Sequence, residues 1–445
     1  TSVSISADGE YIAIASGDKI HLFDKDSGTP LWSYDVGTQN VLSVSISADG
    51  EYIVAGSQND NIYLFDKDSS TPLWSYGTGN DVYTISISSN GEYIVVGSGT
   101  KVYLFDKDSS TPIWSRNADS TVIEWVDISA DGEYIVAGSS GDKVYLFDKD
   151  SSTPLWTYGA GGDVHTVSIS ADGEYIAAGS EDNKVYVFDK DSNTPLWNYA
   201  TDDEVYSVAF TEDSEYLLVS SYDNKVYLFD KDSSTPLWNY ATSGDVRSVA
   251  ISADGKYIFS GVGDQYGNSD KKFYLFDRNS STPLWNYVAE GYAYTAAMSA
   301  DGAYLAGGTL AEGTTADKIF TFKNTLVSRP SIIPYIPLSG NELERPTILR
   351  WFAGSDDISN LTFDVYFGTN SNPTTKVADD ITTLSYTPSN LLMNTKYYWK
   401  VVATDPSGSN TSKVMNFTYK GLTWSYTAGG GIRENGIAIS SNGEY

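Results

Sequence analysis

A stretch of fourteen residues, KVYLFDKDSSTPLW at positions 143–156, recurs with small changes through most of the chain. An associated element, DGEY, recurs with it and places tyrosines 41 residues apart, followed by a last one after a step of 47: Tyr11, Tyr52, Tyr93, Tyr134, Tyr175, Tyr216, Tyr257 and Tyr304. A fixed period near 40 residues is typical of a β-propeller or a solenoid. Most of the chain must therefore fold as neighbouring copies of one structural unit.

One repeat contains four short strands. In residues 164–199, VHTVSIS and KVYVFDKD alternate apolar and polar residues, EYIAAGS is β-branched and small, and TPLWNY closes the unit. The turns ADG and EDN separate these segments, and nothing in the unit has helical period. Four antiparallel strands per repeat are typical of a propeller blade. We therefore predict an all-β fold, a β-propeller.

The repeat resembles two known families. SISADGEYIVAGS followed by KVYLFD is similar to a WD repeat, while Asp148 and Trp156 in FDKDSSTPLW resemble the tryptophan-docking motif of pyrroloquinoline-quinone-type repeats. The Thr-Gly of the second family is replaced here by Ser-Ser or Ser-Gly, so the resemblance implies the scaffold and not the quinone cofactor. It also implies that outer-strand tryptophans dock blade against blade: Trp32, Trp74, Trp114, Trp156, Trp197, Trp238, Trp285 and Trp424.

The last repeat is interrupted. It reaches KIFTF at 318–322, and the next docking segment, LTWSY at 422–426, follows only after about a hundred residues of different character. We therefore predict eight blades in a closed ring, with residues 1–326 forming the propeller, 327–420 an insert, and 421–445 the outer strand of blade eight and the start of a further repeat. A seven-bladed ring with one stray unit is the alternative.

The insert resembles a fibronectin type III domain. Its segments ILRW, LTFDVYFGT, LSYTP, KYYWKVVATD and VMNFTYK read as short strands, with Trp351 on an early one. About 90 residues in seven strands suit a β-sandwich.

Charge and composition exclude some partners. The 58 acidic residues against 28 basic ones give a net charge of −30, which would repel nucleic acid. No apolar run is long enough to span a bilayer. We expect a mature or excised portion of a longer polypeptide, located outside the cell or at its surface. Sequons that are candidates for N-glycosylation, although chance would also produce some, occur at Asn279, Asn360, Asn410 and Asn416.

The sequence offers little for catalysis. Cysteine is absent, whereas the quinone enzymes that the repeat resembles are characterised by a vicinal cysteine pair and a calcium-bound cofactor. Only His21 and His165 occur, so a three-histidine zinc site is excluded. The DKDSS runs could be weak calcium loops, but turn capping by their aspartates is favoured. We predict no enzyme, no cofactor and no metal.

Variation between repeats points to one face. The turn SADGEY and the loop DKDSSTP are nearly constant, whereas the loops at the opposite end differ between blades. The second residue of the first strand varies most, and with a neighbouring tryptophan it defines a predicted ligand-binding ring: Tyr83, Glu124, Trp125, His165, Tyr206, Arg247 and Tyr294. Neutral drift at an exposed rim is the alternative explanation. The predicted function is a non-enzymatic adhesion, envelope or filament component that binds a protein or glycan, or copies of itself; the alternative is a glycan-directed enzyme or lectin.

Overall fold

The structure is a computed structural model that describes residues 2–118, 121–263, 271–310, 317–327, 331–336, 341–343, 348–354, 361–389, 391–406 and 408–419. Every regular element within these ranges is a β-strand. No helix that could cross a membrane occurs in this described part of the chain.

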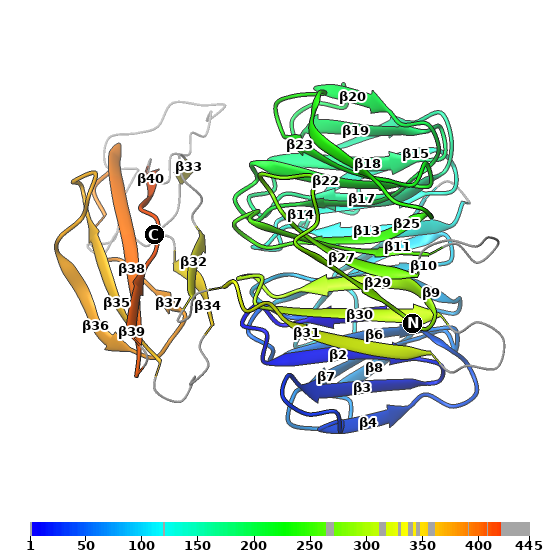
Figure 1. The fold of residues 1–445 in the computed structure, drawn as a ribbon, viewed down its shortest axis with the longest axis horizontal. Helices are drawn as coiled ribbons and strands as arrows, with labels where there is room; N and C mark the ends of the chain where they lie inside the picture. Colours follow the sequence, from blue (N-terminus) through cyan, green and yellow to red (C-terminus); the bar gives the residue numbers. More distant parts are fainter. Residues whose placement is uncertain are drawn as a thin grey trace, which may run out of the picture.

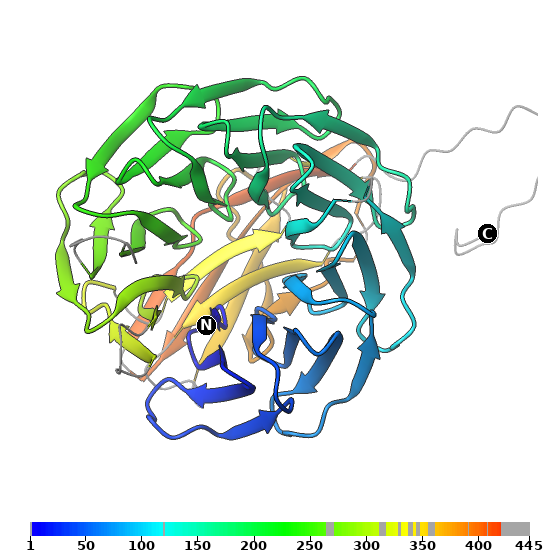
Figure 2. The same cartoon turned by 90° about the vertical axis from the view of Figure 1, so that its right-hand side faces the viewer.

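Seven consecutive sheets each contain four antiparallel strands in chain order, and an eighth sheet contains three. They form the ring in Figure 2, and Figure 1 shows the same sheets from the side. The first four sheets are β1 (Ser2–Ile5), β2 (Tyr11–Ser16), β3 (Lys19–Asp24), β4 (Trp32–Asp35); β5 (Val41–Ile46), β6 (Tyr52–Ser57), β7 (Asn61–Asp66), β8 (Trp74–Gly77); β9 (Val82–Ile87), β10 (Tyr93–Ser98), β11 (Lys101–Asp106), β12 (Trp114–Asn117); and β13 (Ile123–Ile128), β14 (Tyr134–Ser139), β15 (Lys143–Asp148), β16 (Trp156–Gly159). The next four are β17 (Val164–Ile169), β18 (Tyr175–Ser180), β19 (Lys184–Asp189), β20 (Trp197–Ala200); β21 (Val205–Phe210), β22 (Tyr216–Ser221), β23 (Lys225–Asp230), β24 (Pro236–Ala241); β25 (Val246–Ile251), β26 (Tyr257–Val262), β27 (Lys272–Asp277), β28 (Trp285–Val288); and β29 (Tyr292–Met298), β30 (Tyr304–Leu310), β31 (Lys318–Lys323).

The ring closes between its first and last sheets. Strand β1 packs against β29 and β30, and the backbone N–H of Ala300 donates to the carbonyl of Ala7 at 2.9 Å. The same turn-to-turn hydrogen bond joins neighbours elsewhere in the ring, as from Ala130 to Ala171 at 3.1 Å. The sequence therefore builds a β-propeller whose ends meet through the same contacts as its interior sheets.

Tryptophan docking joins the outer strands. Each of the seven described docking tryptophans lies 5.1–5.6 Å, between ring centroids, from a phenylalanine of the following sheet. The indole N–H of Trp156, for example, also donates to the carbonyl of Lys190 at 2.7 Å. These contacts bury an aromatic surface that one sheet cannot cover alone. Trp424 lies outside the described residues.

Two further sheets follow the propeller and lie beside it (Figure 1). Their strands are β32 (Ser331–Ile336), β33 (Asn341–Leu343), β34 (Leu349–Gly354), β35 (Thr362–Gly368), β36 (Lys376–Ile381), β37 (Ser385–Tyr386), β38 (Thr395–Asp405), β39 (Gly408–Thr411) and β40 (Met415–Tyr419). Where seven strands were expected, the described residues of this region contain nine, because short polar segments such as GSNT in β39 also pair. The two sheets share a core in which Trp351 and Trp399 are almost fully buried, with ring centroids 6.5 Å apart.

Candidate functional site

Most of the predicted ring residues lie at β-bulges. In the first strand of seven sheets the pairing skips one residue: Leu42, Tyr83, Glu124, His165, Tyr206, Arg247 and Tyr294. A bulged residue leaves the ladder and its side chain is re-aimed, a feature common next to functional sites. The positions that vary between repeats are therefore those that the sheets leave unpaired.

Contacts join the bulge residues from β17 to β29. The ring of His165 lies 5.9 Å from that of Tyr206, and the guanidinium of Arg247 lies 5.6 Å from the ring of Tyr206 and 5.4 Å from that of Tyr294. Sequence reasoning missed Tyr222, which follows β22, stacks on Tyr206 at 4.7 Å and accepts a hydrogen bond of 2.9 Å from Arg247. Tyr222 could have been found from the sequence, because the turn after the second strand varies between repeats.

Two further residues of the predicted ring are exposed aromatics. Tyr83 is 42% exposed and its hydroxyl lies 3.5 Å from Asp81, whereas Trp125 is 48% exposed. The position of Trp125 is Ser or Thr in the other repeats, and Thr84 there accepts a hydrogen bond from Val126 N in the next sheet. The tryptophan replaces a structural hydroxyl with an exposed apolar surface.

The imidazole of His165 is surrounded by carboxylates. Its Nδ1 lies 3.7 Å from Glu124 Oε2, and its Nε2 lies 3.3 Å from Glu181 Oε1 and 3.7 Å from Glu204 Oε2. The hydrogen bond with Glu124 and the charges of all three carboxylates raise the pKa of His165, while burial opposes them. Sequence reasoning identified Glu124 and His165 but missed Glu181, in the turn after β18, and Glu204, directly before β21.

The central channel of the propeller is covered at the end opposite the bulges. Phe352 of β34 is buried and packs among alanines of the turns between first and second strands: Ala7, Ala48, Ala130, Ala171, Ala253 and Ala300. Lys413 Nζ lies 3.4 Å from Asp213 Oδ2 and adds an ion pair between the same two parts of the chain. The bulge end is therefore the end of the channel away from these sheets.

Two partly buried acids lie inside the channel near the covered end. Asp127 and Glu212 line a polar cavity of about 190 Å³, and Glu212 Oε2 is buried without a hydrogen-bond partner. Asp127 accepts hydrogen bonds from Ile169 N at 3.1 Å, Ile128 N at 2.9 Å and Ser86 Oγ at 3.2 Å. Burial raises the pKa of Asp127 to about 6 and that of Glu212 to about 7, and mutual repulsion adds to the second. Most repeats have alanine at the position of Glu212, so a comparison of the repeats could have identified this residue from the sequence.

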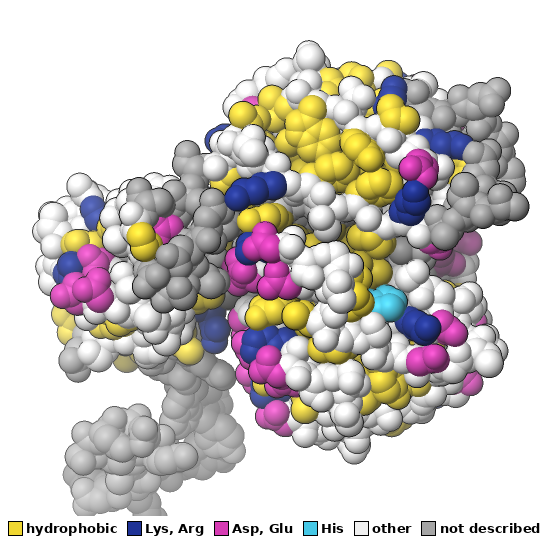
Figure 3. Space-filling view, turned by 60° about the horizontal axis from the view of Figure 1, so that its bottom comes forward, with side chains coloured by type: hydrophobic (Ala, Val, Ile, Leu, Met, Phe, Trp, Pro, Cys, Tyr) yellow, Lys and Arg dark blue, Asp and Glu magenta, His cyan; other side chains and the backbone are white. Residues whose placement is uncertain are grey.

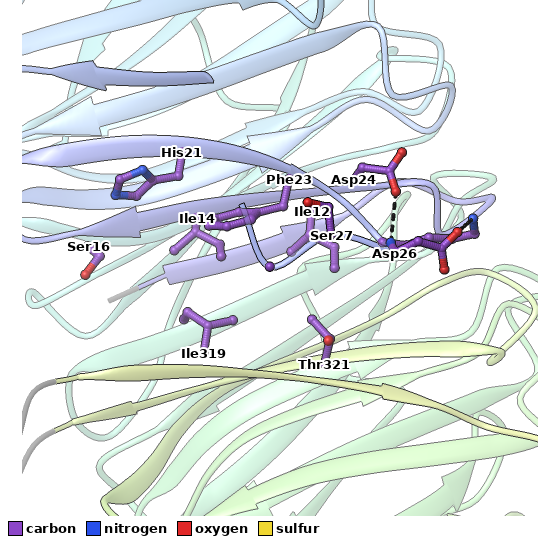
Figure 4. A pocket seen from close by; sticks show the side chains of 12 residues that line it. Ile12, Ile14, Ser16, His21, Phe23, Asp24, Asp26, Ser27, Ile319 and Thr321 are labelled. Atoms are coloured by element: carbon purple, nitrogen blue, oxygen red, sulfur yellow. Dashed lines mark hydrogen bonds and ion pairs between the residues drawn. The ribbon is translucent and has the colours of Figure 1, made fainter. Parts of the chain in front are cut away.

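A larger cavity, of about 440 Å³, lies between β3 and β31. In Figure 4, His21 and Phe23 of β3 lie across this cavity from Ile319 and Thr321 of β31. Figure 3 shows hydrophobic side chains at the surface of this side of the propeller. Phe23 holds the place taken in the next sheet by Phe65, which receives the docked Trp32.

The aspartates that were considered for calcium act within their own turns. Asp24 Oδ1 accepts a hydrogen bond from Asp26 N at 2.9 Å, and Asp148 Oδ1 accepts one from Asp150 N at 2.8 Å. This is the geometry of turn capping by aspartate. Among the sequons, Asn279 and Asn410 are exposed, Asn416 is partly buried, and Asn360 lies outside the described residues.

The fold and its docked sheets define a β-propeller of PQQ-type repeats. Residues 16–159, 99–211 and 207–325 match the family described as outer membrane protein assembly factor BamB. Together these segments cover more than half of the 445 residues, and the chain belongs to this family. No curated protein matches the chain. The crystal structure of the computationally designed Ika8 protein is similar in fold, with a TM-score of 0.60 and 14% identity over 72% of this chain and 96% of that one.

Proposed function

We propose that this chain is a non-enzymatic binding scaffold, a structural or adhesion protein at the cell surface or outside the cell, that holds its partner at the bulge end of the channel. The observation that carries the proposal is that the two ends of the channel differ. One is covered by Phe352, and the other carries a bulge residue from each of seven sheets. Aromatic faces with one guanidinium and several carboxylates suit a peptide or a sugar.

A polypeptide partner is the first choice. The family description names a factor in protein assembly, and the contacts of Arg247 with Tyr206 and Tyr294 leave a preorganised set of aromatic rings. Aromatic and Arg side chains are enriched among the residues that dominate protein interfaces. A second copy of this chain is one such partner, which would make the protein an envelope or filament component.

The proposal extends to the complete architecture. Residues 422–426 would fill the cavity between β3 and β31 as a fourth strand, with Trp424 docked on Phe23, giving eight blades. Residues 327–420 would then be a fibronectin type III-like domain inserted in the last blade. The seven described tryptophan–phenylalanine contacts support this arrangement, because each repeats one geometry.

The test uses a variant in which Tyr83, Trp125, His165 and Tyr206 are all replaced by Ala. Its control replaces by Ala the exposed leucines that directly precede docking tryptophans: Leu73, Leu155, Leu196 and Leu237. Immobilised wild-type protein is used to select from a random peptide phage library and is probed with an oligosaccharide array. We expect ligands that the control retains and the quadruple variant loses. Equal retention by the quadruple variant would move the functional surface elsewhere on the chain.

The alternative is a glycan-directed enzyme or a lectin that acts through the same end of the channel. Analysis of the sugars after incubation distinguishes it from the first proposal. Incubation with the oligosaccharides bound on the array, followed by chromatography, should return them intact. Released shorter sugars would favour the enzyme, and binding of sugars without peptides would favour the lectin. Light scattering of the purified protein tests self-assembly.

A further inference from the structure

The His165 cluster has the dimensions of a metal site. One ligand atom from each of His165, Glu181 and Glu204 lies within 4.8 Å of the other two. Ligands at 2.0–2.2 Å from a tetrahedral zinc ion are separated by about 3.4 Å. The observed separations of 3.3 and 3.7 Å from Nε2 lie close to that value. An ion could enter with small side-chain movements.

The third carboxylate lies on the other side of the imidazole. Glu124 Oε2 faces Nδ1, whereas Glu181 and Glu204 face Nε2. In metal sites, a ligating histidine commonly donates its second N–H to a carboxylate, which fixes the tautomer and orients the ring. Glu124 lies where that partner is needed.

The repeat provides an internal comparison. One repeat earlier, the positions of His165, Glu181 and Glu204 hold Glu124, Ser140 and Asp163. One repeat later, they hold Tyr206, Tyr222 and Asp245. The two neighbouring sites therefore lack this set of one imidazole and two glutamates.

The other acidic cluster of the described residues is different. Asp364 and Asp379 share the ammonium of Lys376, at 2.6 Å from each. That cation is fixed, whereas an imidazolium loses its charge on deprotonation and becomes a ligand. The cluster at His165 thus offers an imidazole nitrogen beside its carboxylates, which the cluster at Lys376 lacks.

We propose that His165, Glu181 and Glu204 bind a divalent transition-metal ion, best matched by zinc, with Glu124 orienting the imidazole. One nitrogen and two carboxylate oxygens are ligands that zinc accepts, and three protein ligands leave a fourth position for water. The site shares His165 and Glu124 with the ring proposed above to bind a peptide or a sugar, but the metal can be titrated without that partner.

The chain allows a sharp test, because it has no cysteine and only two histidines. Untagged protein is titrated with zinc chloride by calorimetry at pH 7.5, and cobalt(II) is followed by its visible absorption bands. The variants are His165→Gln, Glu181→Gln, Glu204→Gln and Glu124→Gln. The matched control is His21→Gln, which removes the other imidazole.

We expect one zinc ion per chain and at least 100-fold weaker binding by His165→Gln. Glu181→Gln and Glu204→Gln should each weaken binding at least tenfold, and Glu124→Gln about tenfold, in the range typical of an orienting carboxylate. His21→Gln should bind as the wild type does. Affinity should fall as pH falls, with about one proton released per ion at low pH.

Three outcomes would overturn the proposal. Undetectable zinc binding by wild-type protein would leave the cluster as an imidazolium–carboxylate ion pair. Zinc binding that is lost in His21→Gln and kept in His165→Gln would show that His21, and not His165, supplies the imidazole ligand. Equal binding of calcium by wild type and His165→Gln, with displacement of zinc, would make it a carboxylate site for hard cations. Circular dichroism of each variant checks that the propeller is folded.

Discussion

The ring of Tyr304, in the last propeller sheet, packs directly on Gly9, in the first turn of the chain. A methyl group at Gly9 would lie 2.6 Å from Cδ2 of Tyr304, and Gly9 has φ of +78°. The same relationship holds between Tyr93 and Gly132, which are neighbours within the ring. The closing contact of the propeller is therefore one more copy of the contact between its sheets.

Gly9→Ala should loosen this closure. The substitution forces a side chain into a left-handed backbone and against Tyr304, so we expect a loss of about 1–3 kcal/mol in the free energy of unfolding. Denaturant titration measures it. Gly28→Ala is the control, since Gly28 has open space around it and should change stability little. Equal effects of both substitutions would contradict the prediction.

Trp156→Ala tests the docking of the outer strands. It removes an indole that packs on Phe188 and donates to Lys190, and we expect a loss of about 2–3 kcal/mol because the ring is only partly buried. The neighbouring Leu155 is 51% exposed, and Leu155→Ala should cost well under 1 kcal/mol. Thermal unfolding followed by circular dichroism compares the two. A tryptophan variant as stable as the leucine variant would remove docking as a source of stability.

Glu212→Gln should change how stability depends on pH. The folded pKa of Glu212 is raised to about 7, so the folded protein binds the proton more tightly than the unfolded chain does. The contribution of this proton to the stability of the wild-type protein should therefore be lost as pH rises from about 4.5 to about 7.

The variant removes this titration. Its advantage over wild type should grow across that window and level off above it at on the order of 3 kcal/mol. The exposed Glu215, changed to Gln, is the control. Denaturation at pH 5, 6, 7 and 8 gives the comparison, and parallel curves for wild type and Glu212→Gln would refute it.

Replacement of residues 327–420 by a short Gly/Ser linker should leave a folded propeller. The propeller sheets have cores of their own, separate from the core around Trp351 and Trp399. The replacement uncovers the alanines beneath Phe352, so we expect lower stability with one cooperative transition retained. Phe352→Ala in the intact chain shows how much of that loss is due to the covered channel end. A non-cooperative transition in the linker variant would contradict an independently folding ring.

Glycosylation, if the chain is exported through a pathway that adds N-glycans, should concentrate at Asn279 and Asn410. Both are exposed, whereas Asn416 has a buried side-chain oxygen. Intact-mass and peptide mapping of native material measure occupancy. The mass of the bare polypeptide would end this prediction.

The repeat made the strands of the propeller predictable, because alternation and turns recur at one spacing. The bulges at Tyr83, His165 and Arg247 were not, since a pattern such as VHTVSI does not reveal which residue leaves the ladder. The variable ring was found by comparing repeats, and the same comparison at Glu212 would have found the buried acid. Glu181 and Glu204 required the structure, because only the packing of adjacent sheets brings two turns to one imidazole.

The seven bulges place the variable residues outside the hydrogen-bonded ladder that fixes the fold. A residue outside the ladder can change type without altering the register of its strand, and each of the seven sheets offers one such position at the same end of the channel. A combinatorial library restricted to these seven codons would therefore present many different surfaces on one backbone. If the bulge end binds a partner as proposed, duplication of the repeat followed by divergence at a single codon per copy would change its specificity.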